Sequence, residues 1–104
     1  MINVPAPLWD DHTRAAIADF SRRNRIRRLA LFGSALRDDF RPDSDLDILV
    51  EFEPDARIGL RFFALQRELT ELFGRAVDLN TPAFLSAYFR DQVMAEAEDL
   101  YVAP

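Results

Sequence analysis

A glycine–serine pair and two aspartates are spaced in a way that suits phosphate chemistry. Gly33 and Ser34 follow the apolar run that ends at Phe32, ten residues intervene, and Asp45 and Asp47 then open a second apolar run. A glycine lets phosphate oxygens approach the backbone, while the serine hydroxyl and the N–H groups of the following turn can bind an anion. Two carboxylates this close repel each other unless a cation lies between them. The spacing therefore predicts a site for metal-bound phosphate.

The amino-acid composition restricts which side chains can bind a metal ion and therefore which metal suits the site. The chain has no cysteine and a single histidine, His12, which we expect to be an exposed residue of a first helical turn rather than a ligand. Oxygen ligands suit Mg²⁺, which keeps several waters and is usually completed by substrate phosphates. Paired carboxylates can bridge two such ions about 3.5–4 Å apart, one at the attacking oxygen and one at the leaving pyrophosphate. Two Mg²⁺ ions are therefore expected.

A third carboxylate, Asp78, lies in a short apolar run. Val77 and Leu79 flank it, so strand alternation sends the aspartate to the face opposite both. If this strand neighbours the one that Asp47 opens, Asp78 can reach the metal and could serve as a general base. The alternative is an exposed acid on an edge strand.

Both helices and strands must position these residues. Apolar periodicity and capping residues predict helices, strands and an intervening short helix after Ser34. The expected helices span 10–24, 58–73, with Gly74 at the end, and 82–98, with a break near Phe89; the strands span 26–32, 46–52, 76–79 and 100–102. Along the second strand, Asp45 and Asp47 share one face and Leu46, Ile48, Val50 and Phe52 the other. The order predicts a single domain over residues 1–104 of the α/β (α+β) class, with a small sheet flanked by helices.

Net charge and aromatic content restrict the classes of molecule that the protein is expected to bind. A net charge of −5 argues against direct nucleic-acid binding, and neither a signal segment nor a membrane-length apolar run is present, so we expect a cytoplasmic protein that is not in a membrane. Five arginines between positions 22 and 28 are interpreted as a solvated helix end. The phenylalanines at 62, 63, 73, 84 and 89 suggest core packing, although a chain with nine phenylalanines could use some of them as a partner surface.

Over roughly residues 26–81 the chain resembles the minimal, MNT-type branch of the polymerase-β-like nucleotidyltransferase superfamily. The resemblance rests on Gly33-Ser34, ten residues, then Asp45-x-Asp47, within the longer runs 32–37 and 40–50. It implies the polymerase-β-like fold with a small mixed sheet. It also implies that Asp45, Asp47 and Asp78 are catalytic metal ligands and that Gly33 and Ser34 hold the triphosphate. Arg37 could bind a phosphate or a partner, or could instead pair with Asp38, Asp39 or Asp43.

The resemblance also implies a function. Many members of this branch pair with a HEPN-type toxin and act as its antitoxin, and studied members use ATP to adenylylate a tyrosine of that toxin. This predicts a Mg²⁺-dependent protein adenylyltransferase that forms a hetero-oligomer with a co-encoded HEPN-type toxin. A second hypothesis is a non-catalytic antitoxin that neutralises its toxin by binding and keeps a vestigial or regulatory nucleotide site. The three acids favour the enzyme.

Overall fold

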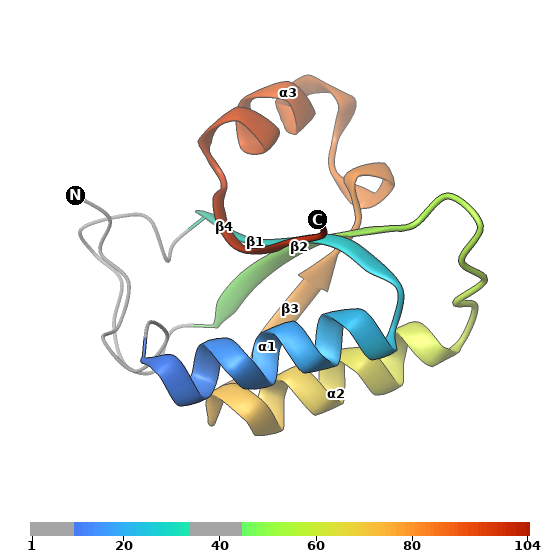
Figure 1. Cartoon of the computed structure of the whole chain (residues 1–104). Helices are drawn as coiled ribbons and strands as arrows, with labels where there is room; N and C mark the ends of the chain where they lie inside the picture. Colours follow the sequence, from blue (N-terminus) through green and yellow to red (C-terminus); the bar gives the residue numbers. More distant parts are fainter. Residues whose placement is uncertain (1–9, 34–44) are drawn as a thin grey trace.

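The computed structural model describes residues 10–33 and 45–104. Within them the chain forms three α-helices, one 3-10 turn and a four-stranded sheet. The elements are α1 (Asp11–Arg23), β1 (Ile26–Phe32), β2 (Leu46–Phe52), α2 (Arg61–Phe73), β3 (Val77–Asn80), η3 (Pro82–Phe84), α3 (Ala87–Glu96) and β4 (Glu98–Val102). Helices α1 and α2 lie on one side of the sheet and α3 on the other (Figure 1). The predicted fold class is confirmed.

The strand order β3-β2-β1-β4 makes the sheet mixed. Strand β1 runs antiparallel to both β2 and β4, whereas β3 runs parallel to β2. Parallel neighbours need a crossover connection, and α2 supplies it between β2 and β3. This pairing brings β3 alongside β2, as the prediction for Asp78 required.

Strand β2 has two different faces. Leu46, Ile48 and Val50 are fully buried and join the core formed with α1 and α2. Each such side chain stabilises the fold by about 1.5–3 kcal/mol relative to its exposed state. Asp47 and Glu51 point to the other face and are only partly buried. Alternation along one strand therefore anchors the sheet to the helices and presents a carboxylate on the opposite side.

Side chains of α2 bind the outer edge of β3. The Leu79 N–H donates to Gln66 Oε1 at 2.9 Å, and the Val77 N–H donates to Thr70 Oγ1 at 3.2 Å. An edge strand otherwise presents unpaired donors, which are costly when buried. Helix α2 thus fixes the position of β3 by hydrogen bonds as well as by apolar packing.

Local sequence explains most helix ends. The Asp10 carboxylate caps α1 by accepting from the Thr13 N–H at 2.7 Å, and this bond lowers the pKa of Asp10. Gly74 ends α2 with a φ of 70°. Helix α2 begins at Arg61 rather than 58, because the chain turns at Gly59, whose φ is 55°.

The helix expected over 82–98 is wrong in its boundaries. The segment divides at Leu85–Ser86 rather than near Phe89, because Leu85 is extended and the Ser86 hydroxyl accepts from the Tyr88 N–H to start a new helix. The last strand is correspondingly longer, beginning at Glu98 rather than 100.

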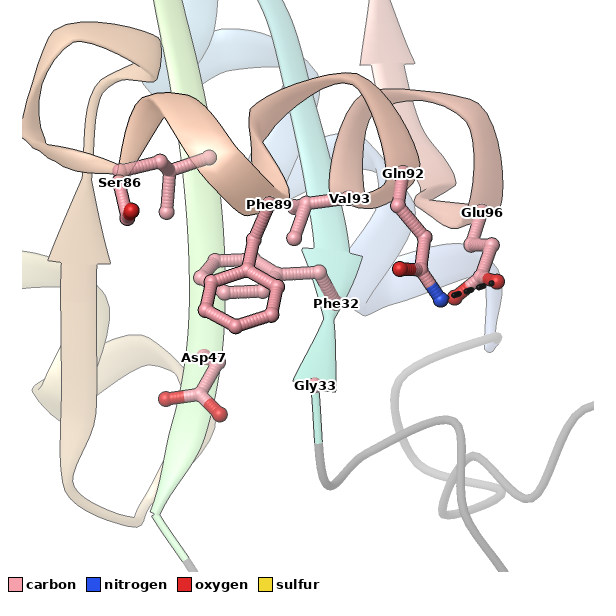
Figure 2. Close-up of a pocket in the computed structure, with 9 residues that line it drawn as sticks. Phe32, Gly33, Asp47, Ser86, Phe89, Gln92, Val93 and Glu96 are labelled. Carbon is pink, nitrogen blue, oxygen red and sulfur yellow. Dashed lines mark hydrogen bonds between the residues drawn. The ribbon is translucent and has the colours of Figure 1, made fainter.

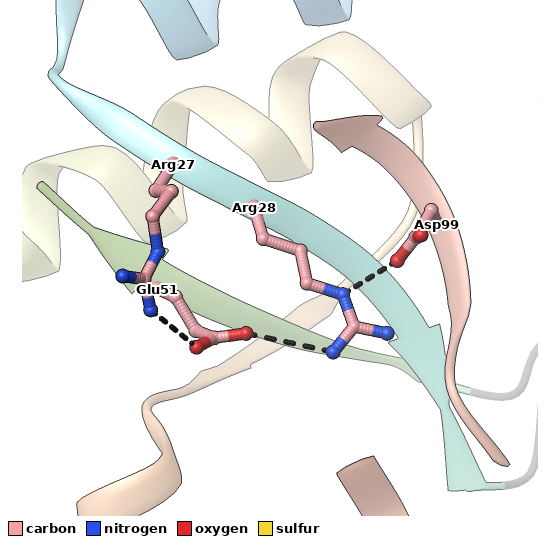
Figure 3. A network of polar contacts seen from close by, with 4 residues as sticks. All are labelled: Arg27, Arg28, Glu51 and Asp99. Atoms are coloured by element: carbon pink, nitrogen blue, oxygen red, sulfur yellow. Dashed lines mark hydrogen bonds and ion pairs between the residues drawn. The ribbon is translucent and has the colours of Figure 1, made fainter. Parts of the chain in front are cut away.

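The arginine-rich segment is not simply a helix end. Only Arg22 and Arg23 lie in the last turn of α1, and Arg23 binds Glu68 of α2 at 2.8 Å. Arg27 and Arg28 lie in β1 instead, where both bind Glu51 of β2 and Arg28 also binds Asp99 of β4 (Figure 3). The charge of Glu51 is thus shared between two guanidinium groups. These pairs join three strands on the α3 side of the sheet.

The expectation that the phenylalanines are core is wrong for three of the five. Phe63, Phe84 and Phe89 are exposed, while Phe62 and Phe73 are partly buried against the core. The buried core consists of aliphatic side chains and Phe20, and it includes none of these three rings. No helix in the part of the chain that the structure describes is long and apolar enough to cross a membrane.

Replacing Gln66 should test the role of α2 in holding β3. In Gln66→Met the Leu79 N–H loses its acceptor, so the free energy of unfolding should fall by about 1–3 kcal/mol, because a buried donor is left without a partner. Urea denaturation followed by circular dichroism measures this change. Gln92→Met is the matched control, since among residues 10–33 and 45–104 the Gln92 amide binds only the exposed Glu96. An equal loss in both variants would contradict the assignment.

Candidate functional site

Two carboxylates lie side by side on the open face of the sheet. In the parallel pairing of β2 with β3, Asp47 is the direct partner of Asp78. Laterally paired residues of a sheet point to the same face, so both carboxylates lie opposite α1 and α2. Phe32 of β1 pairs with Asp47 on the other flank and extends the row. The sequence expectation that Asp47 and Asp78 share a face is therefore met.

Gly33 leaves room for the Asp47 carboxylate. Its φ is 67°, a left-handed conformation that other residues adopt at a cost. A Cβ added at this position would collide with Asp47 Oδ2 and lie 3.2 Å from its Cγ. Glycine is thus favoured for two reasons: the positive φ of the backbone and the close approach of the Asp47 carboxylate. This contact joins the two halves of the motif that the sequence separates by ten residues.

A pocket of about 580 Å³ lies above this row. Its floor consists of Phe32, Gly33 and Asp47, and its roof is the segment that leads into and forms α3 (Figure 2). The roof residues are Leu85, Ser86, Phe89, Gln92, Val93 and Glu96. Such a volume lies within the range of about 300–1,000 Å³ found for small-molecule sites. The lining combines apolar rings with a few polar groups.

The other predicted site residues are less fully placed. Asp45 directly precedes β2 and is exposed, while the N–H of its neighbour Leu46 donates to the Ala76 carbonyl at 2.9 Å. Ser34 and Arg37, together with the short helix expected after Ser34, lie outside the described residues. His12 is exposed in the first turn of α1, as expected.

The three acids do not form a closed cluster. Among residues 10–33 and 45–104, no group of three or more His, Cys, Asp and Glu side chains lies close enough to hold a metal ion. Residues on the same face of a strand are roughly 6–7 Å apart. Asp45 and Asp47 therefore converge on one ion only when both side chains turn toward it. The adjacent pair in the sheet is Asp47 with Asp78.

Four pocket residues of α3 were not anticipated from the sequence. Phe89, Gln92, Val93 and Glu96 follow the spacing i, i+3, i+4, i+7, which places them on one face of a helix. That spacing was the available signal. It was obscured because the face mixes apolar and polar side chains.

Comparison with known proteins agrees with this geometry. The family model of the nucleotidyltransferase domain matches residues 14–100. Protein adenylyltransferase MntA of Thermococcus cleftensis is 35% identical over 78 residues, which cover 75% of this chain and 78% of that protein.

Solved structures share the fold. A proposed minimal nucleotidyltransferase is similar with a TM-score of 0.68 and 36% identity, covering 83% of this chain and 87% of its own. Another similar chain comes from the complex of the MNT antitoxin with the tri-AMPylated HEPN toxin of Shewanella oneidensis. It matches with a TM-score of 0.63 and 23% identity, covering 88% of this chain and 71% of the matched chain. At that identity the likeness shows the fold alone. With its residues 14–100 matched and its paired aspartates beside a glycine turn, this chain belongs to the nucleotidyltransferase domain family.

Proposed function

We propose that this nucleotidyltransferase transfers AMP from ATP to a hydroxyl group, most simply a tyrosine, of a HEPN-type toxin and thereby acts as its antitoxin. The observation that carries the proposal is the side-by-side pairing of Asp47 with Asp78, where Asp47 also contacts Gly33 and lines a pocket large enough for a nucleotide. Similarity to a protein adenylyltransferase supports AMP as the transferred group. The complex of an AMPylated HEPN toxin with an MNT antitoxin supports the partner class.

The donor set fits Mg²⁺. Asp47 and Asp78 offer adjacent carboxylate oxygens, and Mg²⁺ usually takes one or two carboxylates plus substrate phosphates rather than a complete protein cage. Because no three-acid group is present among the described residues, the phosphates of the nucleotide would have to complete the coordination. We assign Asp45 as a further ligand that joins when nucleotide is bound. A bound Mg²⁺ would neutralise the negative charge on the phosphates and the leaving pyrophosphate.

The residues of the chain then have separate tasks. Gly33 and Ser34 hold the triphosphate, and Arg37 adds a cationic phosphate contact. Asp78 receives the proton of the acceptor hydroxyl, whose oxygen forms a bond to the α-phosphorus while the bond to pyrophosphate breaks. Asp47 would hold the Mg²⁺ that neutralises the α-phosphate, so the gain would come from charge stabilisation and from positioning.

An exposed apolar surface at the start of α2 and on η3 is suited to the toxin. The side chains of Leu60, Phe63 and Phe84, which we call the aromatic patch, are 85%, 61% and 64% exposed. The Phe62 ring contacts both phenylalanines, with its centroid 5.9 Å from that of Phe63 and 5.4 Å from that of Phe84. Exposed aromatic residues gathered in this way are typical of protein interfaces. We assign the aromatic patch to toxin binding.

The Gly33 contact gives a sharp test of the site. Gly33→Ala should reduce AMP transfer by at least about tenfold, because the added methyl group displaces the Asp47 carboxylate and misplacement of about 1 Å can cost about 10²-fold. Transfer is measured as incorporation of label from α-labelled ATP into the toxin. Gly59→Ala is the matched control, since Gly59 also has a positive φ, of 55°, but a Cβ there meets nothing within 4 Å. Both variants should lose roughly 1 kcal/mol of stability, and only the first should lose activity.

Replacing the acids should separate catalysis from binding. Asp47→Asn and Asp78→Asn should each reduce AMP transfer by about 10²-fold or more while leaving the toxin complex intact, because the carboxylates stabilise charge that develops along the reaction path. Mass spectrometry of the toxin detects added AMP, and size-exclusion chromatography of the same samples measures the complex. Removing Mg²⁺ with EDTA should abolish transfer by the wild type. Asp91→Asn, an exposed acid on α3, is the control.

The competing hypothesis predicts a different result. If the protein neutralises its toxin by binding alone, the acid variants protect cells fully and the wild type adds no mass to the toxin. That outcome would overturn the enzymatic proposal.

The aromatic patch should determine toxin affinity. Phe63→Ser with Phe84→Ser should weaken the complex by at least about 30-fold, since central aromatic residues of interfaces commonly contribute 2 kcal/mol or more. Calorimetric titration with catalytically silent Asp47→Asn protein avoids turnover during the measurement. Tyr88→Ser is the control, because Tyr88 is 87% exposed but lies outside the patch. Equal weakening by Tyr88→Ser would contradict the assignment.

A further inference from the structure

The pocket over Asp47 is divided into a charged part and an apolar part. Asp47 and Gly33 form the part that suits phosphates, while Phe32, Leu85, Phe89 and Val93 supply apolar surface above them. Figure 2 shows the Phe89 ring beside Phe32 and above Asp47. A flat aromatic base joined to a phosphate chain has the same division. Base–aromatic stacking is favourable for every base, so the rings by themselves do not select among nucleotides.

Selectivity requires polar groups with a preferred orientation, and Gln92 and Glu96 are polar residues of the pocket lining that bind each other. Gln92 Nε2 donates to Glu96 Oε1 at 3.2 Å, across one turn of α3. This bond distinguishes the two ends of the amide, since only the nitrogen can donate to a carboxylate. Figure 2 shows the Gln92 oxygen on the side of the phenyl rings and the nitrogen on the side of Glu96. With this bond in place, the pocket presents the amide oxygen as an acceptor, with the second hydrogen of Nε2 beside it.

Adenine and guanine differ in the hydrogen-bond donors and acceptors that they present to such an amide. Adenine carries an exocyclic amino donor next to the acceptor N7, and a glutamine amide matches both groups at once. Guanine carries the acceptor O6 next to N7, so its O6 would face the Gln92 oxygen. Turning the amide over would give O6 a donor, but it would set the amide oxygen against the acceptor N7 and would break the bond to Glu96. The pair thus favours an amino-bearing purine.

We infer that Phe89 stacks on the nucleobase and that Gln92, oriented by Glu96, selects adenine over guanine. The inference rests on the proposed function, because it assumes that the pocket over Asp47 holds the donor nucleotide. In this assignment Gln92 contacts the base, and Glu96 is a positioning residue that acts through Gln92. The helix face of Phe89, Gln92 and Glu96 is then a specificity-determining part of the site.

Calorimetric titration of the isolated protein with MgATP and with MgGTP tests the inference. The wild type should bind ATP about tenfold or more tightly than GTP, the scale of one well-formed bidentate contact. In Gln92→Leu the ratio should fall to about 1, because leucine offers neither a donor nor an acceptor. Glu96→Ala should also lower the ratio by freeing the amide to turn, a result that loss of structure alone would not produce.

Two further variants separate stacking from selection. Phe89→Ala should weaken ATP and GTP alike, on the order of tenfold, and leave their ratio unchanged. Asp91→Asn, on α3 but outside the pocket lining, should change neither affinity. Melting curves followed by circular dichroism establish that each variant is folded.

The outcomes distinguish this inference from the proposed function. Similar wild-type affinities for ATP and GTP, or an unchanged ratio in Gln92→Leu, would overturn base selection by α3 and leave AMP transfer standing. If the wild type binds neither nucleotide, both the inference and the proposed function fail.

Discussion

The register between β2 and β3 is the constraint on which the site depends. These strands run parallel, and Asp47 lies directly beside Asp78 only in the observed alignment. Because side chains alternate along a strand, a shift of one residue would turn Asp78 toward the helices and bring Val77 or Leu79 to the open face. The buried positions of Val77 and Leu79 oppose that shift. The same apolar burial that stabilises the sheet therefore sets the distance between the two carboxylates.

Helix α2 strengthens this register in a second way. Gln66 and Thr70 accept hydrogen bonds from Leu79 and Val77 on the outer edge of β3, so the strand is bound on both sides. A shifted strand would give up these bonds as well as its pairing with β2. The chemistry on the open face is thus maintained by contacts made on the edge and on the opposite face.

The sheet was predictable because each strand coincides with a short apolar run in the sequence. The limits of β1 and β2 match the apolar runs of the sequence, and alternation assigned Asp47 and Asp78 to one face before their pairing was known. Gly33 was recognised as a close-approach residue, but its contact with Asp47 depends on a tertiary meeting of two strands that spacing alone does not report.

The remaining differences have tertiary causes too. Arg27 and Arg28 lie within the strand predicted over 26–32 but were grouped with a helix end because of their charge, and their partners Glu51 and Asp99 come from distant strands. The pocket face of α3 escaped attention for a related reason. Hydrophobic periodicity detects helices that pack on a core, whereas α3 has no buried residue. The roof of the site was therefore the part that sequence reasoning could least anticipate.

The lack of buried residues in α3 has a consequence for the evolution of this site. Substitutions in a packed core are limited by the cavities and clashes that they create, usually at a cost of several kcal/mol. Substitutions on the face of α3 over the pocket do not have this packing cost, because the core between the sheet and the other two helices contains no residue of α3. Changes on that face can alter what the pocket accepts while the carboxylate-bearing strands stay in place. The fold thus separates the residues that keep it stable from those that are free to diversify.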